Sequence, residues 1–257
     1  METKSAIIIA IINQKGGVGK STTAVNLSAA LGEHNKKTLL VDIDPQGNAT
    51  SGFGVKKGKE LKCVYDGLVN REPVENLIVE NAAKNVDIIP ATINLAGAEV
   101  ELMNEVAREY RLAELLKPIH DWYDYILVDC PPSLGQLTIN GLTAAHSLII
   151  PIQCEFYALE GLTKLLETEK IVKTHMNSEL EILGVLMTMY DSRTTLANQV
   201  VTEVTEHFGD KVFNTIIPRT VRLAEAPSFG ESILAYETKG KGAEAYRCLA
   251  EEVINRG

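Results

Sequence analysis

The sequence predicts an α/β fold in which a single doubly wound, mostly parallel sheet is flanked by helices. Two observations support this prediction. Runs of apolar, largely β-branched residues recur without polar–apolar alternation, which is typical of strands covered on both faces. Stretches with helical spacing separate these runs. Strand–helix alternation over all 257 residues favours one domain spanning residues 1–257.

The expected elements alternate from near the N-terminus to the end of the chain. The strands are Ala6–Ile12, Thr38–Val41, Val86–Ile89, Tyr125–Val128, Ser147–Ile152, Ile182–Met189 and Val212–Ile217. The helices are Ser21–Leu31, Leu95–Leu116, Glu160–Thr174, Thr195–Phe208 and Ala243–Ile254. We expect the first helix to stop at Gly32, because glycine often follows a helix end.

The composition excludes disordered and fibrous proteins, since 45% of the residues are apolar and 23% are charged. The net charge of −9 repels nucleic acid and anionic membranes on average, so DNA binding would need a local basic patch. The apolar run Ala6–Ile12 is too short to span a bilayer. Four cysteines without a CxxC pair indicate reduced, mostly buried thiols in a cytoplasmic protein.

The strongest motif is a glycine-rich loop between the first expected strand and the first expected helix. It has the form of a phosphate-binding loop, but in a deviant version with Lys15 at its head in place of a glycine. Glycines let backbone N–H groups surround phosphate oxygens, and the following helix adds its positive end. Lys20 would reach the β- and γ-phosphates, and Ser21 would bind Mg²⁺. The residues expected to bind ATP here are Lys15, Gly16, Gly17, Val18, Gly19, Lys20, Ser21 and Thr22.

Carboxylates follow two further expected strands. Asp42 and Asp44 come after Thr38–Val41, and Asp129 comes after Tyr125–Val128. Ligands of open α/β sheets bind at the carboxyl ends of the strands. We therefore expect Asp129 to hold the Mg²⁺ shell and Asp44 to orient the attacking water. The expected catalytic residues are Lys15, Lys20 and Asp44.

Five segments of the chain share one resemblance. They are Lys15–Thr22, Asp42–Thr50, Ile89–Glu99, Asp129–Ser133 and Arg222–Gly230. Together they closely resemble the ParA/Soj-type partition ATPases. The loop alone indicates only the wider deviant P-loop superfamily, which includes MinD-like and nitrogenase-iron-protein-like members. The later segments narrow the resemblance, which covers nearly the whole chain.

The resemblance implies a homodimer that forms on ATP binding. In such a dimer Lys15 reaches the partner's nucleotide, and Gly16 faces the partner's loop so closely that a side chain there would block dimerisation. Pro218 and Thr220 would contact the adenine. A ParB/Spo0J-like protein would stimulate hydrolysis, and the ATP dimer would bind non-specific double-stranded DNA on the nucleoid.

The resemblance associates Arg193 and Arg222 with DNA contact, and Arg219 is a third candidate. Because each phosphate contact releases counterions, a dimer that doubles the charge of one surface would switch DNA binding on. We expect no sequence specificity, since only five residues precede the first strand and leave no room for a DNA-reading domain. Other charged residues of this region are Lys239 and Lys241, opposed by Asp191, Glu225, Glu231 and Glu237.

Three other functions remain open. A MinD-like membrane ATPase would need a basic amphipathic C-terminal helix, whereas the last helix carries Glu251 and Glu252 on its polar face. An electron-transfer ATPase would need cluster cysteines, and Cys130 is more readily explained as a small buried thiol. A nucleotide-gated binding module, with hydrolysis acting only as a timer, overlaps with the partition function.

Overall fold

The computed structural model describes residues 5–58, 60–155 and 162–256. These residues form one seven-stranded sheet in the order β3-β4-β2-β5-β1-β6-β7. Neighbouring strands are parallel except β3, which is antiparallel to β4, so the prediction of a mostly parallel sheet is confirmed. The strands are β1 (Ile7–Ile11), β2 (Thr38–Asp42), β3 (Val79–Ala83), β4 (Val86–Ile89), β5 (Tyr125–Asp129), β6 (Ser147–Gln153) and β7 (Glu181–Thr188).

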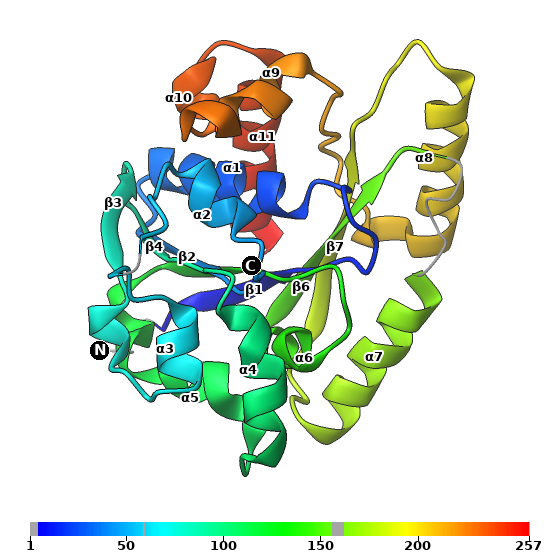
Figure 1. Ribbon diagram of the computed structural model, residues 1–257. Helices are drawn as coiled ribbons and strands as arrows, with labels where there is room; N and C mark the ends of the chain where they lie inside the picture. The colour runs from blue at the N-terminus through cyan, green and yellow to red at the C-terminus, as the bar shows by residue number, and fades with distance from the viewer. Residues whose placement is uncertain (1–4, 59, 156–161, 257) are drawn as a thin grey trace.

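Helices cover both faces of the sheet (Figure 1). One layer contains α1 (Lys20–Glu33), α2 (Asn48–Gly52), α9 (Val221–Glu225), α10 (Ile233–Tyr236) and α11 (Lys241–Arg256). The other contains α3 (Val64–Leu68), α4 (Leu95–Glu101), α5 (Arg111–Leu116), α6 (Gln136–Ala144) and α7 (Leu162–His175), with α8 (Thr195–Phe208) beside β7. Short 3₁₀ turns are η1 (Val74–Asn76), η2 (Leu102–Asn104), η3 (Arg108–Tyr110), η4 (Lys117–Trp122), η5 (Gly209–Lys211) and η6 (Ala226–Phe229).

The central strands supply side chains to two hydrophobic cores, one on each face of the sheet. In β1, Ile8 and Ala10 belong to one core, while Ile9 and Ile11 belong to the other. Successive side chains of a strand point to opposite faces, so an uninterrupted apolar run is required where both faces are covered. This explains why the sequence pattern located the central strands correctly.

The long helix expected over Leu95–Leu116 is wrong, because the structure breaks it into α4, η2, η3 and α5. Ala107 adopts a left-handed backbone with φ 54°, which a right-handed helix cannot contain. The Asn140 side chain of α6 compensates at the break. Its amide donates to the Arg108 carbonyl at 2.9 Å, and its oxygen accepts from the Leu112 N–H at 3.0 Å.

The strand expected over Val212–Ile217 is also wrong. This segment follows β7 only through isolated bridges, Val185 to Val212 and Tyr190 to Pro218. Between them the backbone turns away, and the N–H groups of Asn214 and Thr215 donate to the Glu252 carboxylate of α11 at 2.8 and 3.0 Å. A carboxylate from another element thus takes the place of a strand partner.

Two smaller differences concern the end of α1 and an edge strand. Gly32 lies inside α1, and its small size is needed because a Cβ there would stand 2.1 Å from the Lys84 carbonyl oxygen. The helix ends after Glu33, and Asn35 takes the left-handed backbone. The expected start of a helix at Glu160 lies outside the described residues. Edge strand β3 was not predicted, since its sequence Val-Glu-Asn-Ala-Ala is not an apolar run.

Candidate nucleotide site

The phosphate-loop motif connects the carboxyl end of β1 to the start of α1. Gly17 and Gly19 have φ values of 76° and 90°, a region that side chains with a Cβ rarely enter. The Asn13 amide donates to the Pro151 carbonyl at 2.7 Å, and its oxygen accepts from the Lys15 N–H at 2.9 Å. The loop is therefore tied to β6 at its start, and its glycines adopt the backbone that a phosphate cradle requires.

A second anchor holds the end of the loop. The hydroxyl of Thr188, the last residue of β7, donates to the Val18 carbonyl at 2.8 Å, and both residues are buried. Asn13 and Thr188 were missed as site residues. Asn13 lies two residues before Lys15, so its position next to the motif could have identified it. Thr188 lies 170 residues away in the sequence, so only the fold brings it to the loop.

The two lysines of the loop occupy different environments. Lys20 begins α1 and is buried, and its Nζ donates to the Lys15 carbonyl at 3.0 Å. Burial lowers the pKa of Lys20, while the nearby carboxylates of Asp129 and Asp44 raise it. The ammonium group of Lys15 makes no hydrogen bond or ion pair with another described residue. Lys20 is thus fixed inside the site, whereas the Lys15 ammonium has no partner among the described residues.

Asp129 ends β5 beside β1 and β2, as expected for a strand-end carboxylate. Both of its carboxylate oxygens are buried, and neither has a hydrogen-bond partner among the described residues. Burial raises its pKa well above the usual range, and the neighbouring charges of Asp42 and Asp44 add to this, while Ser21 and Lys20 oppose it. The Ser21 hydroxyl is close enough to affect this pKa but makes no hydrogen bond of ordinary geometry. A buried carboxylate next to a hydroxyl is a donor set that fits Mg²⁺.

Asp42 and Asp44 have separate roles in the loop that follows β2. Asp42 accepts hydrogen bonds from the Thr50 N–H and hydroxyl at 2.8 and 2.7 Å and from the Asp44 N–H at 3.1 Å. Burial nevertheless raises the pKa of Asp42 to about 6, although these hydrogen bonds lower it. Asp42 therefore fixes the loop. Asp44 is also buried, and its Oδ1 accepts a hydrogen bond from the Gln46 N–H at 2.9 Å.

The loop that carries Asp44 is a tight turn. The Gly47 N–H donates to the Asp44 carbonyl at 2.8 Å, and Gly47 has φ 61°. Lys57 Nζ donates to the Gln46 carbonyl at 2.8 Å. A Cβ on Gly47 would stand 2.5 Å from that Nζ, so the turn and the Lys57 side chain are closely fitted.

A cavity of about 290 Å³ opens beside the end of the phosphate loop. Pro218 and Thr220 line it, as do Gly19 and Thr22 of the loop. The Arg219 N–H donates to the Tyr190 carbonyl at 2.9 Å, which holds this segment against the end of β7. The structure thus brings Pro218 and Thr220 to the phosphate loop, and their contact with a base remains a prediction.

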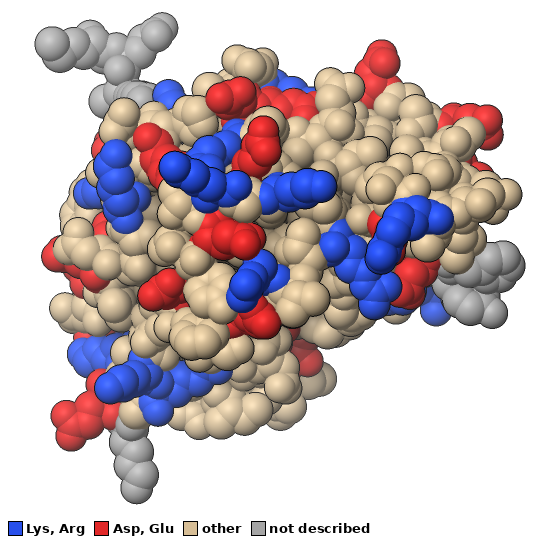
Figure 2. All heavy atoms as spheres, turned by 90° about the horizontal axis from the view of Figure 1, so that it is seen from above, with Lys and Arg blue, Asp and Glu red and all other residues tan. Residues whose placement is uncertain are grey.

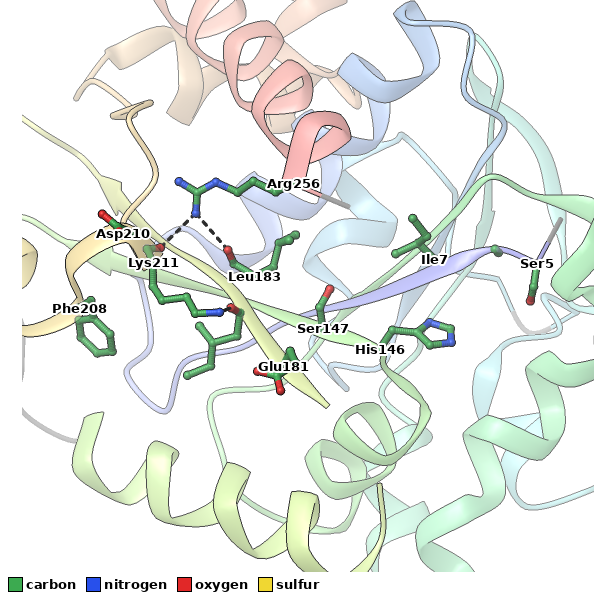
Figure 3. Close-up of a pocket in the computed structure, with 12 residues that line it drawn as sticks. Ser5, Ile7, His146, Ser147, Glu181, Leu183, Phe208, Asp210, Lys211 and Arg256 are labelled. Atoms are coloured by element: carbon green, nitrogen blue, oxygen red, sulfur yellow. Dashed lines mark hydrogen bonds between the residues drawn. The ribbon is translucent and has the colours of Figure 1, made fainter. Parts of the chain in front are cut away.

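A larger cavity, of about 990 Å³, lies elsewhere, at the amino ends of β1, β6 and β7 (Figure 3). Its cationic side chains already have partners. Arg256 donates to the carbonyls of Leu183 and Lys211 at 3.1 and 3.4 Å, and Lys211 donates to the Ile182 carbonyl at 2.9 Å. Without a phosphate loop or free cation, this cavity is a poorer nucleotide site than the smaller one.

The remaining predicted residues lie on the surface near α8 and α9. Arg193 follows β7, Arg222 lies on α9, and Arg219 lies between them in the chain; all three are exposed. Arg193 pairs with Asp191, and Arg222 pairs with Glu225 and Glu237. Arg219 also lines the cavity beside the phosphate loop, together with Pro218 and Thr220.

The chain is similar to known proteins over nearly its whole length. A family model described as an AAA domain matches residues 6–182. The chain is 56% identical to the sporulation initiation inhibitor protein Soj of Bacillus subtilis, over 97% of this chain and 99% of that protein. It is 51% identical to the chromosome partitioning protein ParA of Myxococcus xanthus, over 97% and 88%.

The chain belongs to the ParA/Soj family of partition ATPases.

Among solved structures, this family member resembles one from Mycobacterium smegmatis, described as cobyrinic acid a,c-diamide synthase with bound ADP and magnesium. The TM-score is 0.86 at 38% identity, over 97% of this chain and 94% of that one. The predicted resemblance to ParA/Soj ATPases is thereby confirmed, as is the ATPase class. Within the described residues, no helix combines the length and apolarity needed to cross a membrane.

Proposed function

We propose that this ParA/Soj-family ATPase uses ATP and Mg²⁺ to close a homodimer that binds non-specific double-stranded DNA during DNA segregation. A ParB/Spo0J-like protein stimulates hydrolysis and so releases the dimer. The observation that carries the proposal is the arrangement at one sheet edge. There, Lys15 without a described partner adjoins the buried Lys20 and an unpartnered Asp129 carboxylate. The cytoplasm, at the nucleoid, is the proposed location.

The nucleotide lies across two parts of this edge. The base enters the cavity lined by Pro218 and Thr220, and the phosphates lie over residues 15–22 at the start of α1. Ser21 and Asp129 would hold Mg²⁺, which neutralises part of the phosphate charge when it is bound. Burial is the main cause of the raised pKa of Asp129, and a metal ion bound there would stabilise the charged form of this carboxylate.

Hydrolysis is carried out by the residues that face the γ-phosphate. Asp44 orients the attacking water from a loop that Asp42 fixes to β2. Lys20 offsets charge that develops on the phosphate, and Lys15 of the partner protomer adds a second cation, as an arginine finger does in other NTPases. A Lys15 ammonium without a described partner in its own protomer suits that role.

Dimer closure brings the phosphate loops of two protomers together. Gly16 is exposed, and a Cβ built on it would have nothing within 4 Å in its own protomer. A larger residue is therefore compatible with the monomer fold and would obstruct only a close-fitting partner. The variant Gly16→Val should bind ATP as a monomer.

The decisive experiment measures binding to random-sequence duplex DNA without nucleotide, with ADP and with ATP, over a salt series. We expect binding only with ATP, with a steep salt dependence, since phosphate contacts release counterions. Gly16→Val should abolish both dimerisation and DNA binding while it retains ATP. Sequence-specific or ATP-independent DNA binding would contradict the proposal, as would a Gly16→Val protein that still dimerises.

The structure disfavours the MinD-like and electron-transfer alternatives. The apolar face of α11, with Tyr246, Leu249 and Val253, is buried in the core that it shares with α1, so it is not free to enter a membrane. Cys130 is fully buried against α6, where a Cβ on Gly141 would lie 2.9 Å from its sulfur. If the protein floated with anionic liposomes in the presence of ATP and did not bind DNA, the MinD-like alternative would be favoured instead.

A further inference from the structure

The arginines expected to contact DNA are held by carboxylates of their own protomer. Arg222 donates to Glu225 at 2.9 Å, and its Nε lies 3.6 Å from Glu237. The Tyr236 hydroxyl also donates to Glu225, at 3.3 Å, which helps to keep that carboxylate in place. A phosphate that approaches Arg222 therefore meets two negative charges at the same guanidinium.

Arg193 is held in the same way. Its Nε and one terminal nitrogen donate to the two oxygens of Asp191 at 2.8 and 2.7 Å, a two-point contact. The Arg193 guanidinium lowers the pKa of Asp191 to about 2, and the charge of Arg219 contributes. Asp191 thus stays ionised in any ordinary binding experiment and remains opposed to DNA phosphate.

These six side chains have no net charge. Three arginines contribute +3, while Asp191, Glu225 and Glu237 contribute −3, so the sum is 0. Two copies of this group in a dimer also have no net charge, so dimerisation alone does not make the surface that they form positive. Figure 2, which views the side of the molecule formed by α9 and α10, shows Lys and Arg interleaved with Asp and Glu instead of forming a continuous basic surface.

We propose that Asp191, Glu225 and Glu237 restrain DNA binding by competing with phosphates for the three arginines. Exposed ion pairs are weak, so the phosphates of a duplex can displace them when two protomers bind together. The displaced carboxylates still repel the duplex, which lowers its affinity and the salt concentration at which it dissociates. This inference rests on the proposed DNA binding and adds the residues that limit it.

The test compares two double variants with the same change in charge. Glu225→Gln/Glu237→Gln removes the carboxylates paired with Arg222. Glu231→Gln/Glu244→Gln removes two exposed carboxylates that make no ion pair with a described residue. With ATP at physiological salt, the first should bind random duplex DNA about tenfold more tightly than the second. The salt concentration at which the duplex dissociates should also be higher for the first double variant than for the second.

Two further variants keep the test specific. Adding Arg222→Ala to the first double variant should remove the gain, because the freed guanidinium is its cause. Asp191→Asn should produce a separate gain through Arg193, so the inference does not depend on one variant folding. Thermal unfolding without DNA checks that each variant is folded.

The outcomes distinguish this inference from the proposed function. If the two double variants bind DNA equally, or if the gain survives Arg222→Ala, the restraint is refuted while the DNA-binding function stands. If neither the wild type nor any variant binds DNA with ATP, although nucleotide binding is normal, the proposed DNA binding is wrong and the restraint is wrong with it.

Discussion

The hydrogen bond between Thr188 and Val18 provides a direct test of how the fold supports the phosphate loop. Thr188→Val keeps the size and β-branching of the side chain and removes only its hydroxyl. Thr188 is 2% exposed and Val18 is 1% exposed, so water cannot readily replace the lost donor. The bond is 2.8 Å long in the structure, which indicates that the hydroxyl is well placed.

The expected magnitude follows from that burial. Leaving a buried carbonyl without its partner costs about 1–3 kcal/mol. If the loop alone opens in response, ATP affinity should fall roughly 5- to 150-fold, since about 1.4 kcal/mol corresponds to a factor of ten. Global stability should change less, because β7 keeps its pairing with β6.

Calorimetric titration with a non-hydrolysable ATP analogue, together with thermal unfolding of the nucleotide-free protein, measures both effects. Thr202→Val is the matched control, since that hydroxyl donates to the Asn198 carbonyl on the exposed face of α8 at 3.1 Å. A Thr188→Val protein that binds the analogue as tightly as Thr202→Val would refute the argument that β7 holds the loop.

Three further predictions concern other parts of the molecule. Asp129→Asn should abolish Mg²⁺-dependent hydrolysis but raise the melting temperature without nucleotide at pH 8. Because the pKa of Asp129 is raised in the folded protein, the wild type loses stability as the pH rises through that pKa. The difference in melting temperature between Asp129→Asn and the wild type should therefore vanish in acid. A difference of the same size at pH 5 would contradict this reasoning. Lys57→Met should lower kcat about three- to tenfold with little change in ATP affinity, because the loop after β2 loses its support. The control variant Lys56→Met changes the exposed residue next to Lys57 and should behave as wild type in the same steady-state assay. Gly230→Ala should destabilise the protein in urea unfolding by about 2–5 kcal/mol, because it adds a clash at 2.5 Å to a φ of 69°. Gly209→Ala, with φ 53° and open space, should cost only about 1–2 kcal/mol, and equal losses would be unexpected.

Sequence patterns succeeded where one local rule decides the outcome. Strands buried on both faces must be continuously apolar, and this located β1, β2, β5 and β6. The patterns failed where a distant group decides. Glu252 of α11 takes the amides of residues 214 and 215 out of a strand, and Asn140 of α6 stabilises the break between α4 and α5.

The sequence by itself determined the sheet class, the phosphate loop and the strand-end carboxylates, because each depends on residue type and spacing along a few neighbouring positions. Only the tertiary structure decided which distant side chains hold the phosphate loop in place and which carboxylates pair with the expected DNA-binding arginines. Thr188 reaches the loop from β7, and Asp129 is left buried without a described partner. Glu237 reaches Arg222 from a different turn of the chain. Such contacts join residues that are far apart in the chain or held by different elements, so no local pattern in the sequence contains them.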